Sequence, residues 1–138
     1  MLSIEKILYS GHTATTGGRE GAGRSEDGRL DIKLSPPGAP GSGTNPEQLF
    51  AVCWSASFLA ALRHACNARK ILFPATAAIE AQVDLLHGAQ GFFLQAHLSV
   101  SLPEIEPETA RQLIEAAHQN CPYSKATRRN IDVSFTLN

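Results

Sequence analysis

Two side chains on a long apolar segment are the first candidates for chemistry in this sequence. Cys53 and Ser57 are four residues apart, so on a helix with about 100° per residue they lie some 40° apart and line one groove. A thiolate there could act as a nucleophile or as a redox group. Cys66, nine residues beyond Ser57, would point about 180° away and is interpreted as a structural thiol. Ordinary helix packing is the alternative reading of Cys53.

The third cysteine, Cys121, precedes a proline in the segment Cys121-Pro122-Tyr123-Ser124. Because proline cannot continue a helix, Cys121 is expected to end one element and to cap the next. The free backbone N–H groups at a helix N-terminus favour a thiolate, so Cys121 is a second redox candidate. A half-buried cysteine at a turn is the purely structural alternative.

Arg19 and Glu47 complete the set of candidate residues. Arg19 lies in the glycine-rich segment Gly17–Gly23, and Glu47 lies at the start of the apolar segment that carries Ser57. An arginine on a permissive loop and an acid in a helix's first turn could hold a guanidinium over a pocket. A solvated loop arginine is the alternative.

Other chemistries find little support in the sequence. The five histidines show no clustered spacing, so no metal site is expected. Ser57 lacks the Gly-x-Ser-x-Gly elbow of a hydrolase nucleophile, and no phosphate-binding glycine motif lies between a strand and a helix.

Alternation of apolar and polar side chains predicts about six strands, which must help to position these residues. A hairpin turn is expected at Glu26–Gly28, and residues 35–43 read as a connector with little to contribute to a core. The expected strands are Ile4–Tyr9, His12–Thr16, Leu30–Leu34, Ile79–Leu85, Phe92–Leu102 and Ile131–Leu137.

Two main helices are expected between the strands. The first follows a capping sequence that starts at Thr44 and is apolar over Leu49–Leu62 except at Ser55 and Ser57. A helix that is apolar all round is expected to be buried all round, and fourteen residues are too few to cross a bilayer. A second subunit could cover one side of this helix. The other helix begins near Pro107 and is amphipathic.

Length and composition limit the class of protein. The chain has 138 residues, 43% hydrophobic and 18% charged, which predicts a single folded domain over residues 1–138. The formal net charge of -1 does not favour nucleic acid or anionic membrane surfaces as partners. The N-terminal residues do not read as a signal peptide, so a cytoplasmic location is expected. Three cysteines do not make a disulfide scaffold.

Together, these segments resemble the organic hydroperoxide resistance (Ohr) branch of the OsmC/Ohr family. The Asn-Pro-Glu-Gln-Leu-Phe and Cys-Pro-Tyr-Ser motifs are the most specific parts of the resemblance, which runs from Ile4 to the C-terminus. The matching segments are Thr15–Gly21, Asp27-Gly28, Leu30–Leu34, Thr44–Phe50, Ala117–Ser124 and Asn130–Val133.

The resemblance implies an α+β fold, an intertwined homodimer with two active sites at its interface, and a cysteine-based peroxidase. Such an enzyme reduces organic hydroperoxides to alcohols in oxidative-stress defence and is itself reduced by a lipoyl-type dithiol, such as dihydrolipoamide or a lipoylated protein, with no bound cofactor. By motif, Cys121 corresponds to the resolving cysteine, Arg19 to the arginine that stabilises the thiolate, and Glu47 to the glutamate that orients this arginine.

The sequence departs from the family at the nucleophile. Where the family has a Gly-Tyr-Ser-Ala-Cys-Phe-like segment, this chain reads Cys53-Trp54-Ser55-Ala56-Ser57-Phe58, so Ser57 stands at the peroxidatic cysteine position. A hydroxyl is not appreciably ionised near neutral pH and cannot form a sulfenic acid or a disulfide. The chain is therefore expected to be inactive by that route.

Three explanations of Ser57 stay open. The serine was introduced in place of a cysteine, or it marks a natural paralogue that binds or senses an apolar, lipid-like ligand without catalysis. In the third explanation Cys53 has taken over as nucleophile, although one helical turn displaces its sulfur by roughly 6 Å. The preferred hydroperoxide or ligand does not follow from the sequence.

Overall fold

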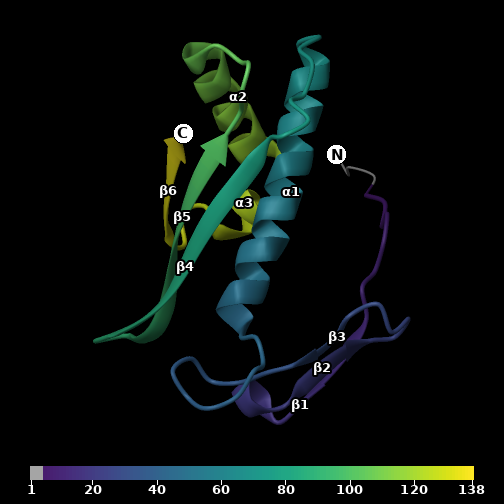
Figure 1. The fold of residues 1–138 in the computed structure, drawn as a ribbon, viewed down its shortest axis with the longest axis vertical. Helices are drawn as coiled ribbons and strands as arrows, with labels where there is room; N and C mark the ends of the chain where they lie inside the picture. The colour runs from purple at the N-terminus through teal and green to yellow at the C-terminus, as the bar shows by residue number, and fades with distance from the viewer. Residues whose placement is uncertain (1–4) are drawn as a thin grey trace. The chain divides into compact units, whose positions relative to one another are not determined.

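The computed structural model describes residues 5–138, which form two compact units, and the boundary between them along the chain falls at the start of a long helix. The first unit extends through Pro46 and the second covers Glu47–Asn138. Each unit is described by itself below. Figure 1 shows the strands and helices of both units.

The N-terminal unit is a three-stranded antiparallel sheet in the order β1-β2-β3. Its strands are β1 (Thr13–Thr16), β2 (Ala22–Ser25) and β3 (Asp31–Lys33). The predicted turn after β2 is confirmed: Asp27 accepts hydrogen bonds from the Ser25 hydroxyl at 2.7 Å and from the Arg29 N–H at 3.0 Å. These bonds hold the pKa of the Asp27 carboxyl below its usual range.

Two sequence predictions for this unit were wrong. Residues 5–9 form no strand, and Ile4 lies outside the described residues. The strand β2 was missed because it falls within and just after a glycine-rich segment that was interpreted as a loop. Between β1 and β2 the chain makes a 3-10 turn over Gly18–Glu20. This turn requires glycine at Gly21, where a Cβ would overlap the carbonyl of Thr16.

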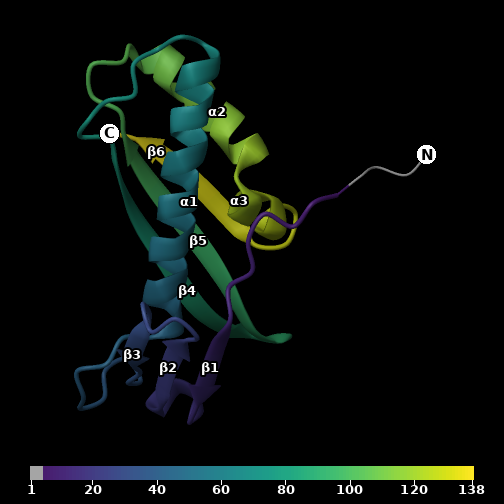
Figure 2. The same cartoon turned by 90° about the vertical axis from the view of Figure 1, so that its right-hand side faces the viewer.

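The C-terminal unit is a second three-stranded sheet with helices packed on one of its faces (Figures 1 and 2). The strands β4 (Ala78–Gly88) and β5 (Gly91–Ser101) form an eleven-residue antiparallel hairpin. The last strand, β6 (Asp132–Leu137), runs parallel to β5. A parallel neighbour needs a crossover connection, which is supplied by α2 (Pro107–Asn120) and α3 (Pro122–Thr127).

The long helix α1 (Pro46–Ala68) contributes the largest side chains of the core. Phe58 is fully buried and stacks on Phe135 of β6, with 5.1 Å between the ring centroids. The other fully buried large apolar side chains come from α1, β5 and α2, and they are Trp54, Leu62, Leu98, Val100 and Leu113.

The prediction that α1 is buried all round does not hold within one chain. The helix extends beyond the apolar stretch Leu49–Leu62, and only one face packs on the sheet; Val52 is 69% exposed and Cys53 is also exposed. With 23 residues, α1 is also long and apolar enough to span a membrane by length and composition alone, a test that core helices of globular proteins pass as well. The argument that it is too short to do so therefore fails.

The start of α2 is fixed by a carboxylate. Glu106 caps the helix by accepting hydrogen bonds from the N–H groups of Glu108 and Thr109, which are orphan donors of the first turn. These bonds, that of Thr109 first, lower the pKa of the Glu106 carboxyl. The predicted helix start near Pro107 is confirmed.

Because the folded-state pKa of Glu106 is lowered, its stabilising effect is present at neutral pH and is lost as the pH falls through that pKa, below the usual glutamate value of about 4.3. We expect Glu106→Gln to lower the urea midpoint at pH 7, with a difference that shrinks at acidic pH. An equal difference at pH 7 and pH 3 would contradict a charge-dependent cap.

Candidate functional site

Ser57 and Cys121 lie in contact, although 64 residues separate them along the chain. The Sγ–H of Cys121 donates to the Oγ of Ser57 at 3.5 Å, a distance within the range for a sulfur donor. Ser57 is half-buried on α1, whereas Cys121 is fully buried. The contact joins two of the residues that the sequence singled out for redox chemistry.

Cys121 sits at the joint between two helices, as predicted. Cys121 is the C-cap of α2, where its backbone N–H donates to the carbonyl of Ala117 at 2.7 Å, and it is also the N-cap of α3. Its backbone is extended, with φ −64° and ψ 125°. Pro122 follows as the first residue of α3, because its ring tolerates the first helical position.

The two other cysteines have separate environments. Cys53 lies one turn before Ser57 and is exposed, so the expectation that both line one groove is not evident within the single chain. Cys66 is fully buried near the end of α1, and burial raises the pKa of its thiol. A protonated, buried thiol agrees with the structural role predicted for Cys66.

Arg19 and Glu47 belong to different units of the structure. Arg19 lies in the 3-10 turn Gly18–Glu20 of the N-terminal unit, and Glu47 lies in the first turn of α1 at the start of the other. Glu47 is therefore in the helical turn where the sequence predicted it. The pairing of the two side chains stays a prediction.

Sequence reasoning missed a pair of residues next to the Ser57–Cys121 contact. The indole N–H of Trp54 donates to the hydroxyl of Ser124 at 3.3 Å, and both side chains are fully buried. Trp54 lies three residues before Ser57, and Ser124 ends the Cys-Pro-Tyr-Ser segment. Helical spacing could have placed Trp54 beside Ser57, but no local signal indicated its partner.

One histidine lies close to this region. His118 in the last turn of α2 packs edge-on against Phe135, at 4.9 Å between the centroids. Burial first, and then the positive charge of Arg128, lower the pKa of His118. Its Nδ1 is buried with no hydrogen-bond partner among the described residues. The low pKa and the apolar contact favour a neutral imidazole that serves packing.

A hollow on the sheet of the C-terminal unit lies away from Ser57. It measures about 530 Å³ and is lined by residues of β4, β5 and β6, most of them polar. His97, one of the lining residues, contacts the hydroxyls of Ser134 and Thr136 through its two ring nitrogens, at 2.6 and 2.8 Å. Because the helices pack on the other face of this sheet, the hollow is separate from the Ser57–Cys121 contact.

The fold and the site define a class of α+β proteins in which a long helix faces a Cys-Pro turn. The family described as OsmC-like protein matches residues 39–136 of this chain. The organic hydroperoxide resistance protein of Xanthomonas axonopodis pv. citri is 43% identical over 141 residues, covering 99% of each chain. The chain belongs to the OsmC-like family, and the resemblance to its organic hydroperoxide resistance branch is confirmed.

Solved structures agree with this assignment. The crystal structure of OhrB of Bacillus subtilis superposes with a TM-score of 0.91 at 39% identity, covering 96% of this chain and 100% of that one. The crystal structure of a Vibrio cholerae protein described as an organic hydroperoxide resistance protein has captopril bound in one of its active sites. It superposes with a TM-score of 0.90 at 39% identity, covering 96% of this chain and 94% of that one. The α+β fold class is thereby confirmed.

Proposed function

We propose that this chain carries the scaffold of a thiol-dependent peroxidase that reduces organic hydroperoxides, and that Ser57 silences it. The relatives named for organic hydroperoxide resistance support a role in peroxide defence. The observation that carries the proposal is the 3.5 Å contact between the Cys121 sulfur and the Ser57 oxygen. A cysteine at position 57 would bring two sulfur atoms to the place where a disulfide can form.

The reaction of such a pair has two oxidation steps. A thiolate at position 57 attacks the terminal oxygen of the hydroperoxide and the O–O bond breaks. The sulfur becomes a sulfenic acid, and the alkoxide leaves as the alcohol with the proton that the thiol had released. The thiol of Cys121 then attacks that sulfur, a disulfide forms and water leaves. A lipoyl-type dithiol, free as dihydrolipoamide or carried on a protein, restores both thiols by exchange and becomes a cyclic disulfide.

Two further residues take roles in this proposal. Arg19 would stabilise the thiolate by its positive charge, and Glu47 would orient the guanidinium through paired hydrogen bonds. The chain would work as a cytoplasmic homodimer with no bound cofactor, metal, nucleic acid or membrane. The single chain leaves apolar side chains of α1 exposed, such as Val52. They support a second copy of the chain that covers this face of the helix.

Ser57 favours a second candidate function, a binding or sensing module for an apolar or lipid-like ligand. The hydroxyl keeps the size of the thiol but none of its redox chemistry. The structure from Vibrio cholerae holds captopril in one of its active sites, which supports a site that accepts a small organic molecule. Cys53 as substitute nucleophile is less favoured, because Cys121 contacts Ser57 and not a residue one turn away.

The oxidation half of the proposal is tested with S57C and one equivalent of cumene hydroperoxide. We expect peptide mapping to find a disulfide between position 57 and Cys121, whereas the unmodified chain keeps Cys121 as a free thiol. In S57C combined with Cys121→Ser, a sulfenic acid should persist and react with dimedone. If S57C remains fully reduced, the peroxidase proposal fails. A Cys53–Cys121 disulfide in the unmodified chain would instead support Cys53.

A further inference from the structure

Three side chains of α1 contact three of the four residues in the Cys-Pro-Tyr-Ser turn. Ser57 meets Cys121, Trp54 meets Ser124, and the ring of Phe50 lies 6.3 Å from that of Tyr123. We call Phe50, Trp54 and Ser57 the α1 clamp. At about 100° per residue these positions fall within some 60° of arc, so they form one stripe along the helix.

The polar contact in the middle of the clamp is the most constrained of the three. Trp54 and Ser124 are both fully buried, and an indole N–H can donate but not accept. If either partner is removed, the other is left as a buried polar group without its bond, which costs more than the bond contributes. The Trp54 ring is also held by Phe50, at 5.6 Å between centroids.

The backbone around Cys121 needs such an external support. The helices α2 and α3 are joined only by the extended residue Cys121, and the first turn of α3 has no side-chain cap. Arg128 ties the far end of α3 back to α2, donating to the carbonyl of His118 at 3.2 Å. The first turn, which carries Cys121 and Ser124, is instead held by α1.

We propose that Trp54 is a positioning residue, whose indole N–H, acting through Ser124, fixes the Cys121 sulfur against position 57. This inference rests on the proposed function for its purpose, because the sulfur must be held where a partner at position 57 can reach it. The hydrogen bond of Trp54 goes to Ser124 and to neither reacting group. It acts on the geometry of the resolving step and not on the attack on peroxide.

The test measures how fast the two sulfurs join when a chemical oxidant replaces the peroxide. In the S57C protein, diamide removes two electrons and two protons from the two thiols and leaves a disulfide. We expect Trp54→Phe and Ser124→Ala, each added to S57C, to slow this step about threefold to tenfold, the range that corresponds to one net hydrogen bond. Ser124→Ala leaves almost no cavity, so it keeps the test valid if Trp54→Phe folds poorly.

Two controls separate positioning from general destabilisation. Phe58→Leu lies on the same helix and is equally buried, but its ring stacks on Phe135 of β6. It should lower the melting temperature while changing the diamide rate less than twofold. The double variant of Trp54 and Ser124 should be no slower than the slower single variant, because both remove the same bond.

The outcomes distinguish this inference from the proposed function. Unchanged diamide rates in both Trp54→Phe and Ser124→Ala would overturn the positioning role, whatever peroxide does. Slowed diamide rates would support it even if hydroperoxides fail to oxidise S57C, a result that would count only against the peroxidase proposal.

Discussion

S57C is expected to consume cumene hydroperoxide continuously with dihydrolipoamide as the reductant, whereas the unmodified chain is expected to show no turnover above the uncatalysed rate. The substitution exchanges one oxygen atom for sulfur at a half-buried position that already contacts Cys121. Loss of a nucleophile commonly removes a thousandfold or more of an enzyme's rate, on the order of 10³ to 10⁶. We expect a gain of at least the lower figure.

Matched variants identify the step of the catalytic cycle at which a loss of turnover arises. Ser57→Ala removes the hydroxyl without supplying a thiol and should be as inactive as the unmodified chain. Cys53→Ser in the S57C protein should leave turnover unchanged within about twofold, since Cys53 is exposed and outside the Ser57–Cys121 contact. Cys121→Ser in the same protein should stop dithiol-dependent turnover, because no disulfide can be presented to the reductant.

Other outcomes would support the alternatives. Turnover by the unmodified chain that Cys53→Ser abolishes would assign the nucleophile to Cys53. If both the unmodified chain and S57C are inactive although the site is intact, binding or sensing of an apolar ligand becomes the better explanation of the scaffold. The assay therefore separates the two classes of function with the same reagents.

The elements of the fold could be predicted from the sequence wherever the signal is local. The alternation in Phe92–Leu102 predicted β5 closely, and Pro107 predicted the start of α2. The strand β2 escaped because glycines mask its alternation. The apolar stretch of α1 was counted only as far as Leu62, but the residues after it, polar ones among them, still form helix and include the buried Cys66.

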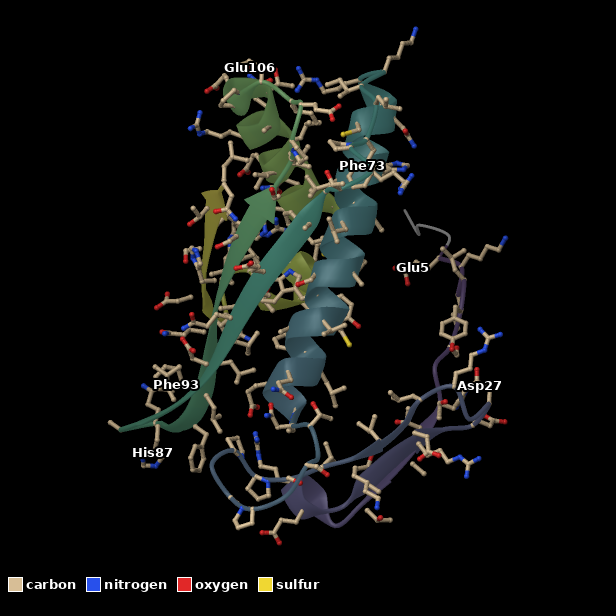
Figure 3. All side chains as sticks on the ribbon, viewed as in Figure 1. Glu5, Asp27, Phe73, His87, Phe93 and Glu106 are labelled. Carbon is tan, nitrogen blue, oxygen red and sulfur yellow. The ribbon has the colours of Figure 1, made fainter. Side chains whose placement is uncertain are left out.

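The hairpin tip shows why burial was harder to predict than strand periodicity. Phe93 lies with His87 at the far end of the β4–β5 hairpin, as Figure 3 shows, and Phe93 is 48% exposed. His87 packs on Phe92, with 4.7 Å between ring centroids. Alternation alone cannot tell that a strand continues beyond the helices that cover it, because the pattern is the same on both sides of that boundary.

In the candidate site, too, local features could be predicted from the sequence, whereas contacts between distant segments could not. Cys121 as a joint between two helices follows from Pro122 alone, so the sequence could place it. Its contact with Ser57 came from a resemblance, and the Trp54–Ser124 bond came from neither source, since 70 residues separate the partners. A hydrogen bond between distant segments is fixed by the packing of whole elements, which local patterns do not encode.

Phe58→Ala is expected to lower the free energy of unfolding by about 3 to 5 kcal/mol, the largest stability effect of a single truncation considered for this chain. Phe58 has no exposed surface, and its ring stacks on Phe135, so the variant loses both buried apolar area and an aromatic contact. The cavity would open between α1 and β6, where no flexible side chain can refill it without leaving its own contacts.

The measurement is urea denaturation followed by circular dichroism, at one fixed protein concentration, because assembly would make the midpoint depend on concentration. Leu72→Ala is the control: it truncates an apolar side chain that is 88% exposed, and it should stay within about 0.5 kcal/mol of the unmodified chain. If Phe58→Ala costs no more than Leu72→Ala, the packing of α1 on the sheet is contradicted.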